Sequence, residues 1–377
     1  MPRIDQQVAK TIVYLYSSYE EAEAGTVSGG SGFLVFVSSK ALKGKGYLYV
    51  ITNKHVIYKN CFFVRVNRKD NKTEIFEIVS DNWEFHPTSD IAIAFILLKD
   101  SSSLKYHYFA DDMLFTREMI KDFDIGLGED VYMVGRFVHH AGKIINLPSV
   151  RSGIISAMPN PDERIKTEMG NQEAFLIEMR SISGFSGSPV VYDFPMTELL
   201  IHVMSKGELN KFSDRKLTPE GFNLRAKTLL LGIDSGNFPL FEKVYKESWE
   251  NEVKKFDPTN YKAENHSGFS VVIPAWEILD LLNSEIFAMH RRETEKKITD
   301  YLDTLKESFE SIVRFVSSDP VVIDFISKVL FQQVLVTLAS SDPVEIDFFS
   351  KEFFQQALEK VIQKNPIHVE EKKETLE

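Results

Sequence analysis

Short apolar runs separated by polar turns make up the first part of the chain. They are rich in Val, Ile, Phe and Tyr, residue types that favour strands. Strands recurring at about ten-residue spacing predict an antiparallel barrel or sandwich. The predicted strands are 8–16, 31–37, 47–53, 61–67 and 73–79, and 86–96 is predicted to be a turn followed by a strand. The polar, Gly-rich segment 18–30 is expected to be a loop.

A second group of predicted strands follows the mixed segment 99–127, which we expect to link two barrels. The polar segment 159–171 is expected to be a loop. The charged and aromatic segment 239–266 interrupts the group, and we expect it to be partly helical. The predicted strands are 129–137, 149–158, 173–179, 188–193, 199–205, 228–236 and 268–274.

After Pro274 the apolar period becomes that of helices. Residues 276–290 predict one amphipathic helix, and a further apolar stripe covers 298–316. The segment 315–335 then recurs as 338–358, and each copy carries Ser-Ser-Asp-Pro, which signals a helix start. Two such copies predict a helical hairpin.

These patterns divide the chain into an N-terminal barrel at 8–115 and a C-terminal barrel with its closing helix at 116–292. A helical extension with the duplicated unit covers 293–364. The charged residues 365–377 are expected to be disordered. Several domains are expected, because a chain of 377 residues exceeds the size of one ordinary hydrophobic core.

Composition is that of a soluble globular protein, with 43% apolar and 26% charged residues. The net charge of −11 argues against a broad nucleic-acid interface. With Cys61 as the single cysteine, an internal disulfide is impossible. The sequence shows neither a signal-peptide pattern nor an apolar run of membrane-spanning length, so we expect a cytoplasmic location and no membrane association.

Candidate chemistry centres on the stretch SISGFSGSPVV at 181–191, which contains Ser186. A tight turn of this kind can present a serine hydroxyl beside backbone N–H groups, as a nucleophile with an oxyanion hole requires. Upstream lie His55, in ITNKHVI, and Asp90, in HPTSDIAIAF. Imidazole suits a general base, and a buried carboxylate can orient it.

These stretches resemble the trypsin-like serine peptidases, most of all the HtrA-type and glutamyl-endopeptidase branches. The resemblance spans roughly residues 8–290 and rests on SGGSGFLV, ITNKHVI, HPTSDIAIAFI, GEDVYMVG, SVRSGIISA, SGFSGSPVV, LLLGIDSG and GFSVVIP, in the family's order. It implies a mainly β fold of chymotrypsin type, a double antiparallel β-barrel followed here by an α-helical extension. It also implies a triad of His55, Asp90 and Ser186, with oxyanion-hole N–H groups on Gly184 and Ser186.

The chain departs from the family pattern at Phe185, where digestive members carry Asp and many bacterial ones carry Asn. Phe185 cannot form a salt bridge with a freed N-terminus, so zymogen-type activation is not expected. The resemblance maps the substrate pocket onto Arg180, Asp234 and Ser235, where Arg180 would favour an acidic side chain and Asp234 a basic one. The alternative is that Arg180 and Asp234 pair with each other and leave a small pocket. Ser235 is also a candidate to hold Asp90. A recognisable PDZ-like domain is absent from the sequence.

No cofactor or metal is expected. His86 stands in a predicted turn, and the pair His139–His140 in a predicted loop lacks the spaced Cys/His partners of a metal site. Cys61 lies in an apolar run that is typical of packing.

The sequence therefore predicts a serine endopeptidase that cleaves a protein or peptide substrate through an acyl-enzyme. The alternative is an inactive peptidase-fold scaffold, with Phe185 disturbing the oxyanion loop. The aromatic helices in 293–364 either pack within the protein or serve oligomerisation, partner binding or regulation of the peptidase.

Overall fold

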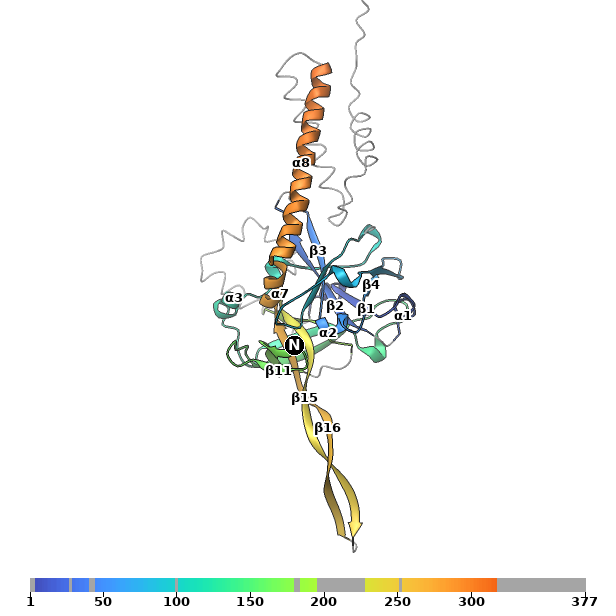
Figure 1. The fold of residues 1–377 in the computed structure, drawn as a ribbon, viewed down its shortest axis with the longest axis vertical. Coiled ribbons are helices and arrows are strands. Elements are labelled where there is room, and N and C mark those ends of the chain that lie inside the picture. The colour runs from blue at the N-terminus through green and yellow to red at the C-terminus, as the bar shows by residue number, and fades with distance from the viewer. Residues whose placement is uncertain are drawn as a thin grey trace, which may run out of the picture. The chain divides into compact units, whose positions relative to one another are not determined.

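The computed structural model describes residues 4–26, 29–40, 45–98, 101–179, 184–194, 228–250 and 253–316. Strands dominate up to Pro274 and helices follow it, as the apolar periods predicted (Figure 1). The duplicated helical units and the expected disordered tail lie outside the described residues beyond 316, as does the predicted strand 199–205. The described part of the chain contains no helix long and apolar enough to cross a membrane.

The first sheet has eight strands in the order β5-β4-β1-β2-β3-β7-β6, with β8 pairing in parallel with β2. The pairs β1–β2, β1–β4, β4–β5, β3–β7 and β6–β7 are antiparallel. Its end strands β5 and β6 are not paired with each other in the described ranges. The strands are β1 (Ile12–Tyr16), β2 (Gly30–Ser38), β3 (Gly46–Thr52), β4 (Phe63–Asn67), β5 (Thr73–Glu77), β6 (Trp83–Phe85), β7 (Ala92–Phe95) and β8 (Phe109–Ala110).

The second sheet closes on itself as a barrel in the order β10-β13-β16-β15-β14-β9. Closure leaves no open sheet edge in the barrel. The strands β11 (Ile165–Thr167) and β12 (Gly170–Gln172) form a separate two-stranded sheet. The barrel strands are β9 (Asp130–Gly135), β10 (Ser149–Ala157), β13 (Phe175–Glu178), β14 (Pro189–Asp193), β15 (Thr228–Glu250) and β16 (Val253–Pro274).

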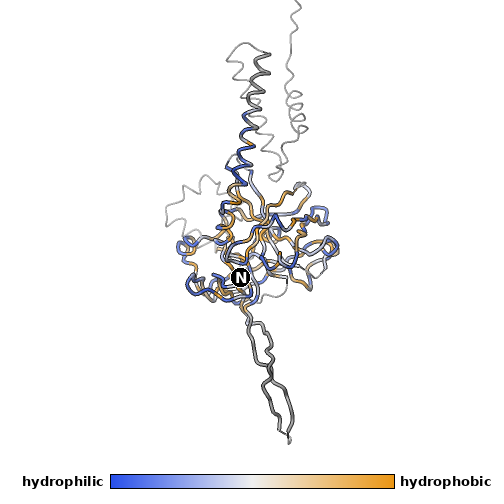
Figure 2. The backbone as a smooth tube through the Cα atoms, viewed as in Figure 1, coloured by the Kyte–Doolittle hydropathy of each residue, from blue (hydrophilic) through white to orange (hydrophobic). Residues whose placement is uncertain are grey.

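Hydrophobic residues recur along the part of the chain that forms the two sheets, as the hydropathy colours of the backbone in Figure 2 show. All five residues of β1 are buried, and so are those of β14. Continuous apolar runs of this kind suit strands that are covered on both faces. The two sheets therefore provide the hydrophobic core on which the loops described below are built.

Helices and short turns connect these strands. The helices are α1 (Tyr19–Ala24), α2 (Lys54–Ile57), α3 (Arg117–Asp122), α7 (Ala275–Leu282) and α8 (Glu285–Val316). Turns of 3-10 helix occupy Val8–Lys10, Ser80–Asn82, Ser101–Ser103, Asp111–Met113 and Val138–His140.

The prediction of a loop over 18–30 was wrong in part, because α1 lies within it. Ser18 caps this helix by accepting the N–H of Glu21 at 3.2 Å, and Gly25 ends it at φ +63°. Ser18 and Glu21 have the spacing of a capping box. Capping thus explains a helix that the apolar pattern does not reveal.

The segment 239–266, expected to be partly helical, is instead strand. Beyond the barrel β15 and β16 continue to pair with each other, from Pro239↔His266 to Glu250↔Val253 (Figure 1). The register shifts between Asp234 and Gly236, which marks a β-bulge at the start of this ribbon. The antiparallel ladder already formed in the barrel extends into the insertion and overrides its weak helical pattern.

Two further predictions were wrong in detail. The segment 159–171, expected to be a loop, contributes β11 and most of β12. The single helix expected over 276–290 is divided, because α7 ends at Leu282 and α8 begins at Glu285. The backbone N–H of Asn283 donates to Leu279 and closes the last turn of α7. Helix α8 then continues without interruption through the second predicted stripe.

Leu231→Ala tests the core of the second barrel. Leu231 is fully buried, so its truncation should lower the free energy of unfolding by about 2–5 kcal/mol. Urea denaturation followed by circular dichroism measures the change. Leu127→Ala is the matched control, since Leu127 is 69% exposed and should lose less than about 0.5 kcal/mol. Equal losses in the two variants would contradict the placement of Leu231.

Candidate active site

The side chains of His55 and Asp90 form the centre of the site. His55 lies in α2, directly after β3, and Asp90 lies in the turn before β7. His55 Nδ1 is 2.7 Å from Asp90 Oδ2, and the backbone N–H of His55 donates to Asp90 Oδ1 at 3.1 Å. Because a carboxylate can only accept, Nδ1 carries the proton, so in the neutral ring Nε2 is an acceptor. The Asp90 side chain is fully buried, whereas that of His55 is 19% exposed.

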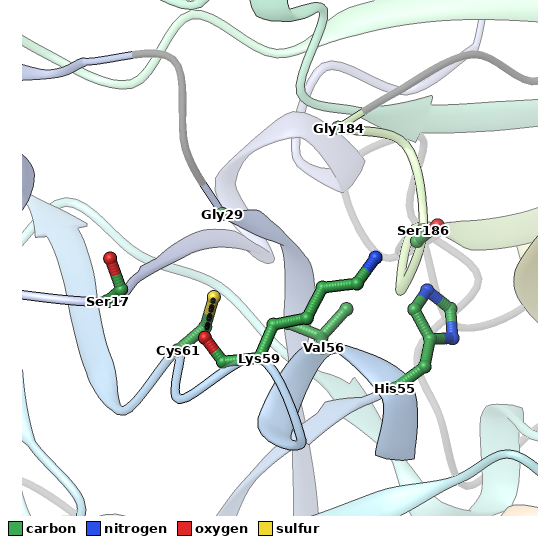
Figure 3. A pocket seen from close by; sticks show the side chains of 8 residues that line it. All are labelled: Ser17, Gly29, His55, Val56, Lys59, Cys61, Gly184 and Ser186. Carbon is green, nitrogen blue, oxygen red and sulfur yellow. Dashed lines mark hydrogen bonds between the residues drawn. The ribbon is translucent and has the colours of Figure 1, made fainter.

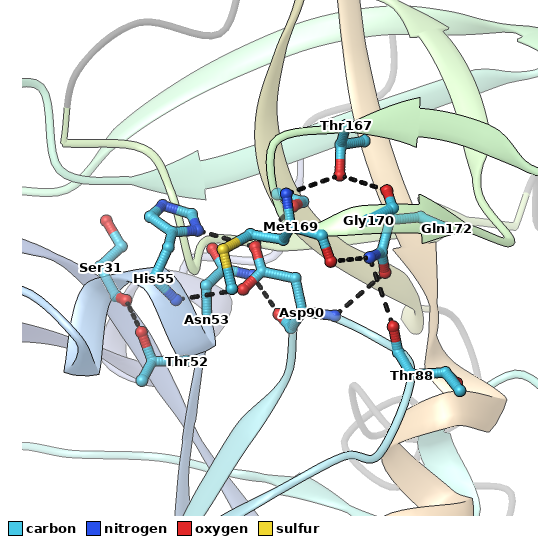
Figure 4. A network of polar contacts seen from close by, with 11 residues as sticks. Ser31, Thr52, Asn53, His55, Thr88, Asp90, Thr167, Met169, Gly170 and Gln172 are labelled. Carbon is cyan, nitrogen blue, oxygen red and sulfur yellow. Dashed lines mark hydrogen bonds and ion pairs between the residues drawn. The ribbon is translucent and has the colours of Figure 1, made fainter.

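Residues far away in the chain hold Asp90 in place (Figure 4). Its backbone N–H donates to Gln172 Oε1 at 3.0 Å, and its carbonyl accepts from Asn53 Nδ2 at 2.8 Å. Ser235 Oγ donates to Asp90 Oδ2 at 2.7 Å. Gln172 is fully buried at the end of β12 and also donates from Nε2 to the Met169 carbonyl at 3.1 Å. The carboxylate and the backbone of Asp90 are thus fixed from both sheets.

Gln172 was not singled out from the sequence. It follows a segment expected to be a loop, and neither its neighbours nor its spacing marks it. The hairpin of β11 and β12 alone brings its amide against Asp90, which a one-dimensional pattern cannot show.

Ser186 lies in a turn that requires glycine on both sides. Gly184 has φ +95° and Gly187 has φ +86°, a region that side chains with a Cβ rarely adopt. A Cβ on Gly184 would lie 2.4 Å from Val138 Cγ2, and one on Gly187 would lie 2.0 Å from the Ser31 carbonyl oxygen. The Gly-x-Ser-Gly pattern therefore has a steric origin, and it fixes the backbone on either side of the hydroxyl.

Ser31 of β2 ties this turn to the first sheet. Its backbone N–H donates to the Ser186 carbonyl at 2.9 Å, and its hydroxyl donates to the Gly184 carbonyl at 2.7 Å. The same hydroxyl accepts from the backbone N–H of Arg136 at 2.9 Å, and the Ser31 carbonyl accepts from Thr52 Oγ1 at 2.8 Å. This fully buried serine is a second functional residue that sequence reasoning missed, although it stands in the quoted stretch SGGSGFLV.

Phe185 packs into the protein instead of lying in the site. Its side chain is fully buried, and the Arg151 guanidinium lies over its ring at 4.8 Å. Arg151 also lies 5.8 Å from the Phe137 ring. The Phe185 carbonyl accepts the Ser188 N–H at 2.8 Å and closes the turn. A cation–π contact thus anchors the residue before Ser186.

The predicted pocket residues have three different outcomes. Arg180 lies outside the described residues. Asp234 is fully buried, with its carboxylate bonded to Ser270 Oγ and its carbonyl accepting the Gly187 N–H at 2.9 Å. The structure therefore places Asp234 under the Ser186 turn, away from solvent. Ser235 contacts Asp90, as its alternative assignment predicted.

His55 and Ser186 line one cavity of about 330 Å³ (Figure 3). The lining residues are Ser17, Gly29, His55, Val56, Lys59, Cys61, Gly184 and Ser186. Burial raises the pKa of the Cys61 thiol to about 11, so this cysteine is protonated at neutral pH and is a poor nucleophile. The cavity therefore brings Ser186, a candidate nucleophile, together with His55, a candidate base.

His86 belongs to a buried network behind Asp90. Its Nε2 lies 3.5 Å from the Glu277 carboxylate, which also accepts from Ser89 Oγ. Arg117 pairs with Glu173 and lies 3.7 Å from Glu277. Burial lowers the pKa of His86, against the opposing effect of Glu277. Within the described ranges, groups of His, Cys, Asp and Glu that could hold a metal ion are absent.

Comparison with known proteins was made by sequence and by structure. Neither a protein-family model nor a curated protein matches the chain. Among solved structures it is similar to the apo protease domain of MamO from Magnetospirillum magneticum, with 15% identity and a TM-score of 0.41. This match covers 74% of this chain and 99% of the MamO domain. The chain is also similar to HBP, with 10% identity, a TM-score of 0.36 and coverage of 75% and 95%.

Likenesses this distant say nothing of activity. The protein has a mainly β fold of chymotrypsin type, with a closed six-stranded barrel, a second sheet and C-terminal helices. This is the fold class that the sequence predicted.

The contact between Arg151 and Phe185 can be measured by a double-mutant cycle with Arg151→Met and Phe185→Leu. A partly buried cation–π pair should give a coupling energy of about 0.5–2 kcal/mol. Urea unfolding of the wild type, both single variants and the double variant provides it. Additive losses would show that the guanidinium does not stabilise the Phe185 ring.

Proposed function

We propose that the protein is a serine endopeptidase, which hydrolyses peptide bonds through an acyl-enzyme. One observation carries the proposal: a fully buried carboxylate lies 2.7 Å from His55 Nδ1, and His55 shares a cavity with Ser186. The acceptor nitrogen Nε2 of His55 is the base that this chemistry needs.

In the first step His55 Nε2 takes the proton of the Ser186 hydroxyl as Oγ attacks the peptide carbonyl. The imidazolium then gives this proton to the departing amine, which leaves Ser186 acylated. Water attacks the acyl-enzyme with His55 again as the base, and the second product leaves. The reaction needs no cofactor, because each proton moves through one imidazole.

Asp90 orients the His55 ring and stabilises its charged form. Asp90 Oδ2 accepts two hydrogen bonds, one from His55 Nδ1 and one from the Ser235 hydroxyl. Gln172 is a positioning residue in this scheme, since it acts through the backbone of Asp90 and touches no reacting atom.

The backbone N–H groups of Gly184 and Ser186 are the donors that we assign to the developing oxyanion. Their geometry depends on the turn between the two positive-φ glycines. Burial of Phe185 beneath Arg151 supports an ordered turn at this position. The finer resemblance to the HtrA-type and glutamyl-endopeptidase branches adds a protein or peptide substrate to the proposal.

Intact mass after incubation with a fluorophosphonate tests the proposal. The full-length protein should gain a single adduct on Ser186, because a serine that is activated by His55 attacks phosphorus readily. Ser186→Ala should gain none.

Ser103→Ala serves as the control, since Ser103 lies in a 3-10 turn outside the cavity and should be labelled like the wild type. A folded wild-type protein that gains no adduct would overturn the proposal. It would favour the second candidate, a peptidase-fold binding protein that does not cleave.

Gln172→Leu should slow labelling about tenfold or more, because small displacements of catalytic groups cost that much. The variant leaves the Asp90 N–H without its acceptor while the side-chain volume changes little. The second-order rate constant of labelling is the readout. Asn171→Leu, an exposed position in the same strand, should react at the wild-type rate. Equal rates in Gln172→Leu and the wild type would remove the positioning role.

A further inference from the structure

The cavity beside Ser186 contains a cation that the proposed reaction does not use. Lys59 lines it together with His55 and Ser186. In Figure 3 the Lys59 side chain extends across the pocket, with its ammonium towards Ser186 and His55 and away from Ser17. Among the described residues, none forms an ion pair with Lys59. A peptide in the cavity would therefore meet an ammonium that has no competing partner there.

The chemistry assigns this cavity to one side of the scissile bond. His55 must protonate the departing amine, so the leaving group departs along the face of the site that carries His55. More of the lining comes from α2 and from the residues that follow it, namely Val56, Lys59 and Cys61. Gly236 also lies close to Ser186, because a Cβ on it would be 3.9 Å from Ser186 Oγ. It does not line the cavity. The cavity is thus the leaving-group side.

Charge along the cavity is uneven. At its other end Ser17 donates its hydroxyl to the Glu21 carboxylate, so a negative charge stands behind Ser17. The whole chain has a net charge of −11, which disfavours acidic peptides in general. Lys59 is therefore a local positive charge in a chain that is negative overall. It acts on the substrate residue that lies nearest the reacting atoms.

We propose that Lys59 makes the protein select substrates with an acidic residue directly after the cleaved bond. This inference rests on the proposed peptidase function and adds a specificity to it. A carboxylate at that position meets the Lys59 ammonium, whereas residues further along approach Ser17 and Glu21 and gain nothing from a negative charge. Electrostatic complementarity of this kind discriminates between substrates more than it raises affinity.

Cleavage-site profiling tests the proposal without knowledge of the acyl-side preference. A denatured protein mixture is digested with the full-length protein, and mass spectrometry identifies the residue after each cut. Peptides built on a preferred site then carry Asp, Asn or Lys at this one position. Asp should exceed Asn in kcat/KM about threefold to fivefold, the effect of an exposed ion pair. Added salt should reduce the ratio.

Lys59→Gln should abolish the preference for Asp over Asn, and Lys59→Glu should reverse it in favour of Lys. Lys121→Glu carries the same change of charge on exposed α3, outside the cavity, and should cleave with the wild-type preference. Cleavage with one unchanged preference in all variants would overturn this inference and leave the peptidase function standing. A protein that gains no fluorophosphonate adduct and makes no cuts would overturn both.

Discussion

Burial of the Asp90 carboxylate is the constraint on which the site depends. A charge removed from water is tolerated only where hydrogen bonds and opposite charge replace its hydration. Asp90 meets this demand with two contacts from His55 and one from Ser235, while Gln172 and Asn53 satisfy its backbone. His55 and Asn53 are neighbours in the chain, whereas Gln172 and Ser235 come from distant strands, so the arrangement exists only when these strands are in register.

The Ser186 turn obeys a second constraint of the same kind. Its positive-φ glycines leave no room for a Cβ, and Ser31 bonds the turn on two sides. Ser31 belongs to the first sheet, whereas the turn precedes β14 of the barrel. The alignment of Ser186 therefore depends on the contact between the two sheets. Loss of either sheet would be expected to remove the site as a whole.

The sequence predicts those parts of the site that are encoded locally. His55, Asp90 and Ser186 stand in stretches whose turn and strand signals are contiguous, so their neighbours identify them. Gln172, Ser31 and Arg151 act through contacts with residues distant in sequence, and nothing beside them marks a role. The strand pairing that brings them into place is a tertiary property, which an apolar pattern specifies only in part.

The difference between local signals and long-range contacts also explains the errors in the predicted fold. Helix α1 is set by its caps, which the apolar period ignores. The segment 239–266 has a mixed pattern, and the ladder of β15 with β16 decides its structure. The continuous apolar run of β1 is a strong local pattern, and a strand was predicted there, although Val8–Lys10 at the start of the predicted strand is a 3-10 turn.

The β-bulge between Asp234 and Gly236 places Ser235 as the extra residue of β15, because Asp234 pairs with Val272 and Gly236 with Val271. A bulge changes the direction of the side chain that it carries, and Ser235 is the residue whose hydroxyl donates to Asp90 Oδ2. Removal of the extra residue would restore regular alternation and turn the side chains that follow it to the opposite face. An irregularity of one residue in the ladder thus decides which side chain reaches the buried carboxylate.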